Sequence, residues 1–136
     1  MKYTINYITY DPVTTISKCE IQTIDGTFRA ESKPDISDRD LVSNYFGCTI
    51  AEYKCLKKAC KRRMQNIKQK IKAMHELKAD CEYAGFDDHH RIDMKLNDYR
   101  NQLKFAMQEY LKTEETIKYF IETHEEIKKK IKSWTE

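Results

Sequence analysis

The sequence is poor in the residues that interrupt regular structure. It has only three Gly and two Pro among 136 residues. So few glycines exclude the Gly-rich loops that cradle phosphates in mononucleotide-binding folds. The charged fraction is 35% and the hydrophobic fraction is 40%, which is typical of long solvated helices rather than of a β-sandwich or a disordered chain. A chain of this length is expected to form one domain, residues 1–136.

The marks of membrane and secreted proteins are also missing. No run reaches the roughly 18 apolar residues that a membrane span needs. Met1-Lys2 is followed by an alternating pattern rather than by the apolar core of a secretory signal. The five cysteines include no CxxC pair, so we expect reduced thiols in a cytoplasmic protein (the host cytoplasm, if it is viral). Cys55 and Cys60 lie on an apolar helix stripe and are predicted to be buried.

The residue sets of common enzymes are absent as well. No Ser/His/Asp or paired Cys/His arrangement stands out, and we expect no catalytic activity and no cofactor. Residues 81–91 include several competent metal ligands, but none of them is spaced as in CxxC or HxxxH sites: Cys81, Asp87, Asp88, His89 and His90. Adjacent His side chains on a helix diverge by about 100°. Asp87 and Asp88 are more simply explained as acidic residues at a helix N-terminus, so no metal site is predicted.

Strand patterns fill the first quarter of the chain. Residues 2–10 alternate and are rich in β-branched and aromatic side chains. A second alternation follows Asp11-Pro12, and Asp25-Gly26 is a strong hairpin signal before a third strand. These patterns predict a three-stranded antiparallel β-meander over residues 1–33.

The alternation also predicts which side chains of the first strand share a face. Three are placed on one face and two on the other: Tyr3, Ile5 and Tyr7 against Ile8 and Tyr10.

Helix signals begin after the meander. Ser37 with Asp40 resembles a capping box, which predicts a short helix over residues 38–46 with Gly47 as its stop. Thr49 with Glu52 then predicts the start of a long helix over residues 49–80. The fold class is therefore α+β: a meander, a short helix, and a long antiparallel helical hairpin.

The last predicted helix, residues 88–135, carries a regular apolar seam. Its positions recur at alternating steps of four and three, as in coiled coils: Ile92, Leu96, Tyr99, Leu103, Ala106, Tyr110, Thr113, Ile117, Phe120, His124, Ile127, Ile131 and Trp134. The first long helix has its own apolar stripe at Tyr53, Leu56, Cys60, Met64, Ile67, Ile71, Met74 and Leu77. At 1.5 Å per residue the first long helix spans roughly 45 Å and the second roughly 66 Å. Folding back about Gly85 brings Phe120 near the start of the first helix. The seam at residues 124–134 then needs the meander or a second copy as its cover, and we expect a homodimer or a higher oligomer.

One stretch concentrates positive charge. Residues 57–72 hold eight Lys or Arg and no acidic residue, although the net charge of the chain is only +3. In a hairpin centred on Gly85 this stretch faces residues 98–113, which offer no net compensation. The Glu-rich stretch at residues 114–126 can pair with Lys54, Lys57 and Lys58 but hardly with Lys68 to Lys72. The pattern predicts a positive surface near Lys61, Arg62 and Arg63, which is either a solvated face or an anion site.

One spacing in this region resembles a known signature. It is carried by seven residues: Asp40, Val42, Gly47, Ile50, Ala51, Lys54 and Cys55. It resembles the D-x-F-x4-G-x-x-I-A-x-x-R-A signature of small bacteriophage accessory proteins, with Val, Lys and Cys where that signature has Phe, Arg and Ala. Among small phage proteins of this size are the anti-Thoeris sponges. The resemblance implies a phage protein with a meander and helices that captures a cyclic-nucleotide immune signal, and it carries over only Lys54 as a binding residue.

These observations lead to two functional hypotheses. The first is a non-catalytic phage anti-defence protein that sequesters a host immune signalling nucleotide at or near a dimer interface. Phosphates would be held by Lys54, Lys57, Lys58, Arg62 and Arg63, and a base would stack on Tyr45, Phe46 or Tyr53. The second is a protein-binding inhibitor of a host nuclease such as a CRISPR effector, and a structural coiled-coil virion protein stays a third option. Direct nucleic-acid binding fits the charge but lacks any motif.

Overall fold

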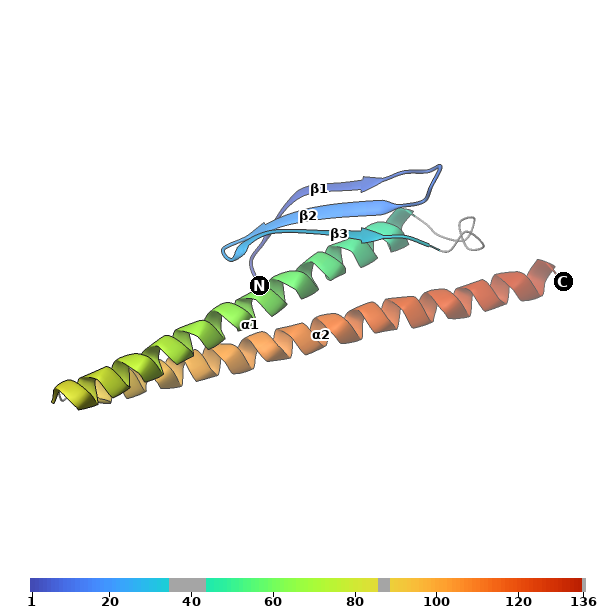
Figure 1. The fold of residues 1–136 in the computed structure, drawn as a ribbon. Helices are drawn as coiled ribbons and strands as arrows, with labels where there is room; N and C mark the ends of the chain where they lie inside the picture. Colours follow the sequence, from blue (N-terminus) through green and yellow to red (C-terminus); the bar gives the residue numbers. More distant parts are fainter. Residues whose placement is uncertain (35–43, 86–88, 136) are drawn as a thin grey trace. The chain divides into compact units, whose positions relative to one another are not determined.

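The computed structural model describes residues 1–34, 44–85 and 89–135, and it confirms the α+β class (Figure 1). Three strands come first, followed by two long helices: β1 (Thr4–Tyr10), β2 (Ser17–Thr23), β3 (Gly26–Ser32), α1 (Asn44–Ala84) and α2 (His89–Thr135). The chain divides into two compact units. The first unit is Met1–Ala59 with Leu111–Glu136, and the second unit is Cys60–Tyr110. The predicted single domain and the predicted homodimer stay predictions.

The sheet of the first unit is the predicted antiparallel meander, in the order β1-β2-β3. The Asp25-Gly26 hairpin is confirmed, because Gly26 has a φ of 135°, which residues with a Cβ rarely adopt. The first turn is organised by Asp11, whose Oδ1 accepts a hydrogen bond from the backbone N–H of Val13 at 2.9 Å. That turn places Thr15 at a φ of 58°.

A β-bulge at Asn6 overturns the predicted faces of β1. Ile5 pairs with Ile21, but the next ladder partner, Glu20, pairs with Tyr7. The extra residue changes the alternation, so Ile5 and Ile8 share a face and Tyr7 lies on the other. The Asn6 amide donates a hydrogen bond to Glu20 at 2.9 Å, which fixes the bulged residue. Strict alternation was therefore the wrong expectation for this strand.

The core of the first unit lies between the sheet and α1. It consists of small and medium side chains from both elements: Cys19, Ile21 and Ala30 against Ala51, Cys55 and Ala59. Figure 1 shows the sheet lying along the beginning of α1. The small α1 residues let the sheet backbone approach that helix closely. This packing also confirms the predicted burial of Cys55, and Cys60 is buried as well.

The first long helix begins earlier than predicted. The expected stop at Gly47 was wrong, since α1 starts at Asn44 and Gly47 is a buried residue inside it. An interior Gly costs a helix about 1 kcal/mol, and burial of Ile50 and Ala51 in the following turn offsets this cost. Residues 38–43 of the predicted short helix lie outside the described residues. At the other end α1 extends to Ala84 rather than residue 80, and Gly85 follows with a φ of 77°.

The second unit is an antiparallel pair made from the last part of α1 and the first part of α2. Its buried apolar residues lie on the two predicted stripes: Cys60 and Ile67 on α1, and Ile92, Leu96 and Ala106 on α2. An ion pair joins Lys78 to Asp93 at 2.8 Å. The predicted helical hairpin is thus confirmed. The paired residues Lys78 and Asp93 lie at nearly equal sequence separations from Gly85.

Candidate functional site

Two of the predicted ligand-binding lysines contact the sheet. The Lys54 ammonium donates a hydrogen bond to the backbone carbonyl of Glu31 at 3.2 Å, and Lys58 donates to that of Arg29 at 2.5 Å. Both acceptors belong to β3, which has no neighbour on its outer side in the three-stranded sheet. Lysines that cover an edge in this way satisfy acceptors that would otherwise be open to another strand. Lys54 and Lys58 therefore have a structural role at this edge.

Two further basic residues of α1 face carboxylates of α2. Lys57 lies 3.8 Å from Glu114, as predicted for the acidic stretch of α2. Lys54 and Lys58, which were predicted to pair with the same stretch, bind β3 instead. Arg63 lies 4.0 Å from Glu109, at the limit of an ion pair. Pairs of this exposure and length contribute at most about 1 kcal/mol each. They reduce the local positive charge without fixing either side chain firmly.

Lys61 and Arg62 keep their charge exposed. Both side chains are exposed, and no ion pair joins either of them to any residue that the structure describes. They belong to the second unit, as does Arg63, whereas Lys54, Lys57 and Lys58 belong to the first unit. The predicted cluster of five phosphate-binding residues is therefore distributed over two separately described units.

The three predicted base-stacking residues have different surroundings. Tyr45 is 73% exposed. Phe46 stacks on His124 of α2, with ring centroids 4.0 Å apart and planes inclined by 16°. Tyr53 packs against Phe120 with centroids 5.9 Å apart. Phe46 and Tyr53 thus hold α1 against α2 within the first unit.

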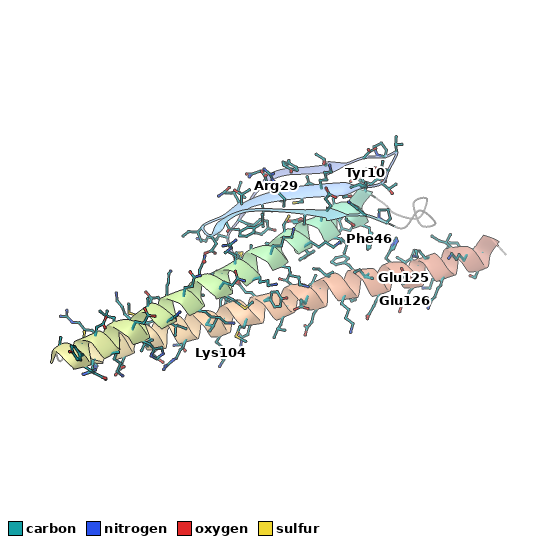
Figure 2. All side chains as sticks on the ribbon, viewed as in Figure 1. Tyr10, Arg29, Phe46, Lys104, Glu125 and Glu126 are labelled. Carbon is teal, nitrogen blue, oxygen red and sulfur yellow. The ribbon has the colours of Figure 1, made fainter. Side chains whose placement is uncertain are left out.

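A cleft of about 180 Å³ lies beside the Phe46–His124 pair. It is formed by the end of β3 with the residues just after it, the first turns of α1, and α2 around His124. Its polar and aromatic lining consists of Ser32, Lys33, Phe46, Lys54, His124, Glu125 and Lys128. Figure 2 labels Phe46 and Glu125, which contribute to this lining from α1 and α2. The cleft brings together two of the predicted site residues, Phe46 and Lys54.

Sequence reasoning missed the other cationic groups of the cleft. Lys128 is only 7% exposed, and its ammonium lies 2.8 Å from a carboxylate oxygen of Glu125. The predicted seam placed Ile127 inward, but Ile127 is 48% exposed and Lys128 takes the inward position. Lys33 lies 3.2 Å from Glu31 on the β3 side. The available signal for Lys128 was its spacing of four residues from His124, which puts both on one helix face.

The buried cysteines are protected rather than reactive. Burial raises the pKa of the Cys19 thiol to about 12 and also raises that of Cys55. The Cys55 thiol donates to the backbone carbonyl of Cys19 at 3.2 Å. A nucleophilic cysteine needs a lowered pKa and access to solvent, and these two thiols have neither.

The described residues form neither a metal cluster nor a membrane-spanning helix. Within residues 1–34, 44–85 and 89–135, no three His, Cys, Asp or Glu side chains gather as a metal site would require. Asp87 and Asp88 of the ligand-rich stretch lie outside these ranges. No helix in the described part of the chain is both long enough and apolar enough to cross a membrane.

The chain was compared with known proteins at three levels. No protein-family model, curated protein or solved structure matches it. The cleft and the charges around it are therefore the features from which a function can be inferred.

Proposed function

We propose that this protein binds an anionic ligand without chemical turnover in the cleft between the end of β3, the start of α1 and α2 near His124. One observation carries the proposal: three lysines and a stacked aromatic pair line the same small cleft. The lining holds Lys33, Lys54 and Lys128 against one acidic residue, Glu125, so its formal charge is +2 with neutral His124. Positive charge beside ring faces suits a phosphate attached to a flat group.

The present partners of these lysines are compatible with exchange for a phosphate. Lys54 donates to a neutral backbone carbonyl, and a charged phosphate oxygen would make a stronger, charge-assisted bond. Lys33 lies on the rim, where its pairing with Glu31 is solvent-exposed and weak. Lys128 is already ordered by Glu125, so it would supply charge at little further entropic cost.

The volume of the cleft restricts the ligand. Pockets that enclose drug-sized molecules have volumes of roughly 300 to 1,000 Å³. A cleft of about 180 Å³ is smaller, so it fits the phosphate-bearing end of a nucleotide rather than the whole molecule. The remainder of the ligand would lie over the rim.

The ligand class that we propose first is a host immune signalling nucleotide, captured by a phage anti-defence protein in the host cytoplasm. The support is that Lys54, the residue that the resemblance to small phage proteins carries over, lies in this cleft with Phe46. Binding without cleavage requires no general base or metal.

A specific observation favours a second candidate, binding to a protein. Of the exposed basic residues of α1 in the second unit, four share one side of the helix: Lys61, Arg62, Lys68 and Lys72. The nucleic-acid groove of a nuclease is itself basic and would repel this face. The face would instead fit an acidic patch on a nuclease such as a CRISPR effector. A structural coiled-coil role in a virion would require neither the cleft nor the basic face of α1.

Isothermal titration calorimetry with two matched variants tests the first proposal. Lys54 and Lys58 each donate to a carbonyl of β3, but only Lys54 lines the cleft. With pyrophosphate, ADP-ribose and a cyclic dinucleotide as probes, we expect Lys54→Gln to weaken binding about tenfold, as loss of a hydrogen bond to a charged group would. Lys58→Gln should retain wild-type affinity.

Two results would contradict this proposal. One is the absence of heat with every probe at high micromolar concentration, and the other is an equal effect of the two substitutions. Mass spectrometry of the recovered probe should show it unchanged. A hydrolysed product would contradict binding without turnover.

A further inference from the structure

The two edges of the sheet are treated differently. The outer edge of β3 is covered by Lys54 and Lys58, whose ammonium groups bind its carbonyls. β1 is the other edge of the sheet, and among the described residues no side chain outside the sheet binds the backbone of residues 4–9. Natural proteins protect sheet edges with charges, Pro or covering segments, because an open edge pairs readily with another strand. β1 is therefore the available edge.

The composition of β1 is unusual for an exposed edge. Residues 3–10 carry no charged side chain. Three of their apolar or aromatic side chains are more than a third exposed on the helix-facing side: Tyr3 at 37%, Ile5 at 42% and Ile8 at 36%. The α1 helix covers the side chains of β2 and β3 but leaves these three partly exposed, although the Tyr3 hydroxyl reaches Glu52 of α1. The exposed apolar strip therefore extends beyond the core of the first unit.

The bulge gives this strip a symmetric pattern. The ladder partners of Ile5, Ile8 and Tyr10 are the buried residues of β2, so these three point toward the helix side. Tyr3 points the same way, since its hydroxyl binds Glu52 of α1 at 2.6 Å. The outward residues are Thr4, Asn6, Tyr7 and Thr9, with Asn6 reaching Glu20. Read in either direction, residues 3–10 give the same order: in, out, in, out, out, in, out, in.

We propose that β1 pairs antiparallel with β1 of a second copy, with the two-fold axis between Asn6 and Tyr7. In this register Ile5 opposes Ile8 of the second copy, and Tyr3 opposes Tyr10. Every inward side chain thereby meets another inward one, as an antiparallel pair requires. Two sheets of three strands become one of six, and the exposed strip is covered by its own symmetry mate.

Charge supports a second copy as the occupant. The same register places Lys2 opposite Asp11 of the second copy at both ends of the pairing, while no charge lies between them. Asp11 accepts from the N–H groups of Val13 and Thr14 in the turn, which holds its carboxylate at the exposed end of the strand. Interleaved opposite charges of this kind fix a register. The pairing does not involve the cleft, so its test is independent of the proposed function.

Sedimentation over a range of concentrations tests the pairing. The wild-type chain should shift from monomer toward dimer between about 5 and 500 µM, as a small edge interface predicts. Ile8→Lys should weaken dimerisation at least tenfold, because it puts like charges beside an apolar pair. Ile24→Lys is the control, since Ile24 is an equally apolar residue, 97% exposed, at the β2–β3 turn. If Ile8→Lys disturbs folding, Lys2→Glu, which lies outside the strand, should weaken the dimer by a factor of about five.

Disulfide cross-linking tests the register itself. Thr4 and Thr9 oppose each other across the proposed axis, on the outward face. In a background with Cys48→Ser and Cys81→Ser, a mixture of Thr4→Cys and Thr9→Cys chains should form the mixed disulfide, and neither variant alone should cross-link. A wild-type chain that stays monomeric at 500 µM would overturn the proposal. So would a dimer in which the mixed disulfide does not form.

Discussion

At the residue scale, the same side chain can have a structural and a binding role. Lys54 and Lys58 stand one helical turn apart and make the same kind of bond to β3, but only Lys54 also lines the cleft. Charge and helical spacing did not separate the two lysines, and only the resemblance singled out Lys54. The two lysines differ because of where β3 ends in the fold. The spacing of residues in the sequence does not show that position.

Ser17 offers a test of the packing under the sheet. It is fully buried, and its hydroxyl has no hydrogen-bond partner in the described part of the chain. A buried hydroxyl without a partner carries a desolvation penalty, so Ser17→Ala should raise the free energy of unfolding by about 1 kcal/mol. Urea unfolding measures this. Ser32→Ala is a neighbouring comparison on the paired strand. A destabilisation by Ser17→Ala would show that the hydroxyl has a favourable interaction.

Cys19 makes stability depend on alkaline pH. Burial raises its pKa from 9.0 to about 12, so the folded chain keeps the proton while the unfolded chain loses it. The favourable contribution is complete below about pH 9 and is lost as the pH rises toward 12. The free energy of unfolding should therefore fall over this range. Cys19→Ala should make that fall shallower, and an unchanged slope in urea titrations at several pH values would contradict the assignment.

At the scale of elements, hydrophobic periodicity predicted the two long helices and their buried faces better than it predicted where each helix begins and ends. The two long helices and their apolar seams follow from residue spacing, and the structure places Ile67, Ile92 and Leu96 inside as expected. Gly47 misled the prediction because a local preference for a helix end was weaker than packing of the following turn. The predicted faces of β1 were wrong from Asn6 onward, because the alternation of residue types in the sequence does not reveal a β-bulge.

Gly85 tests the end of α1. Its φ of 77° lies in the left-handed region, and a Cβ there would meet no atom within 4 Å. Backbone strain alone should therefore make Gly85→Ala destabilising by about 1 kcal/mol. Gly85→Asn should cost less, because Asn tolerates this conformation. Thermal unfolding of the two variants gives the comparison, and equal melting temperatures for wild type and Gly85→Ala would argue against a strained turn.

At the scale of the whole molecule, the fold class was accessible from sequence but the site was only partly so. Phe46 and Lys54 were predicted as binding residues and do line the cleft. Lys33, His124 and Lys128 complete it, and they were missed because they come from elements far apart in the chain. The basic stretch at residues 57–72, which first suggested an anion site, contributes no residue to the lining of the cleft. From Cys60 onward it belongs to the second unit.

The most direct test of the central claim is a chemical-shift titration. Backbone amide signals of the ¹⁵N-labelled protein would be followed while pyrophosphate and then ADP-ribose are added. We predict saturable shifts confined to the residues that border the cleft: residues 32–34, 46–54 and 121–128. Shifts confined instead to residues 61–72, or no saturable shift with either ligand, would contradict the claim that the cleft beside Phe46 and His124 is the anion site.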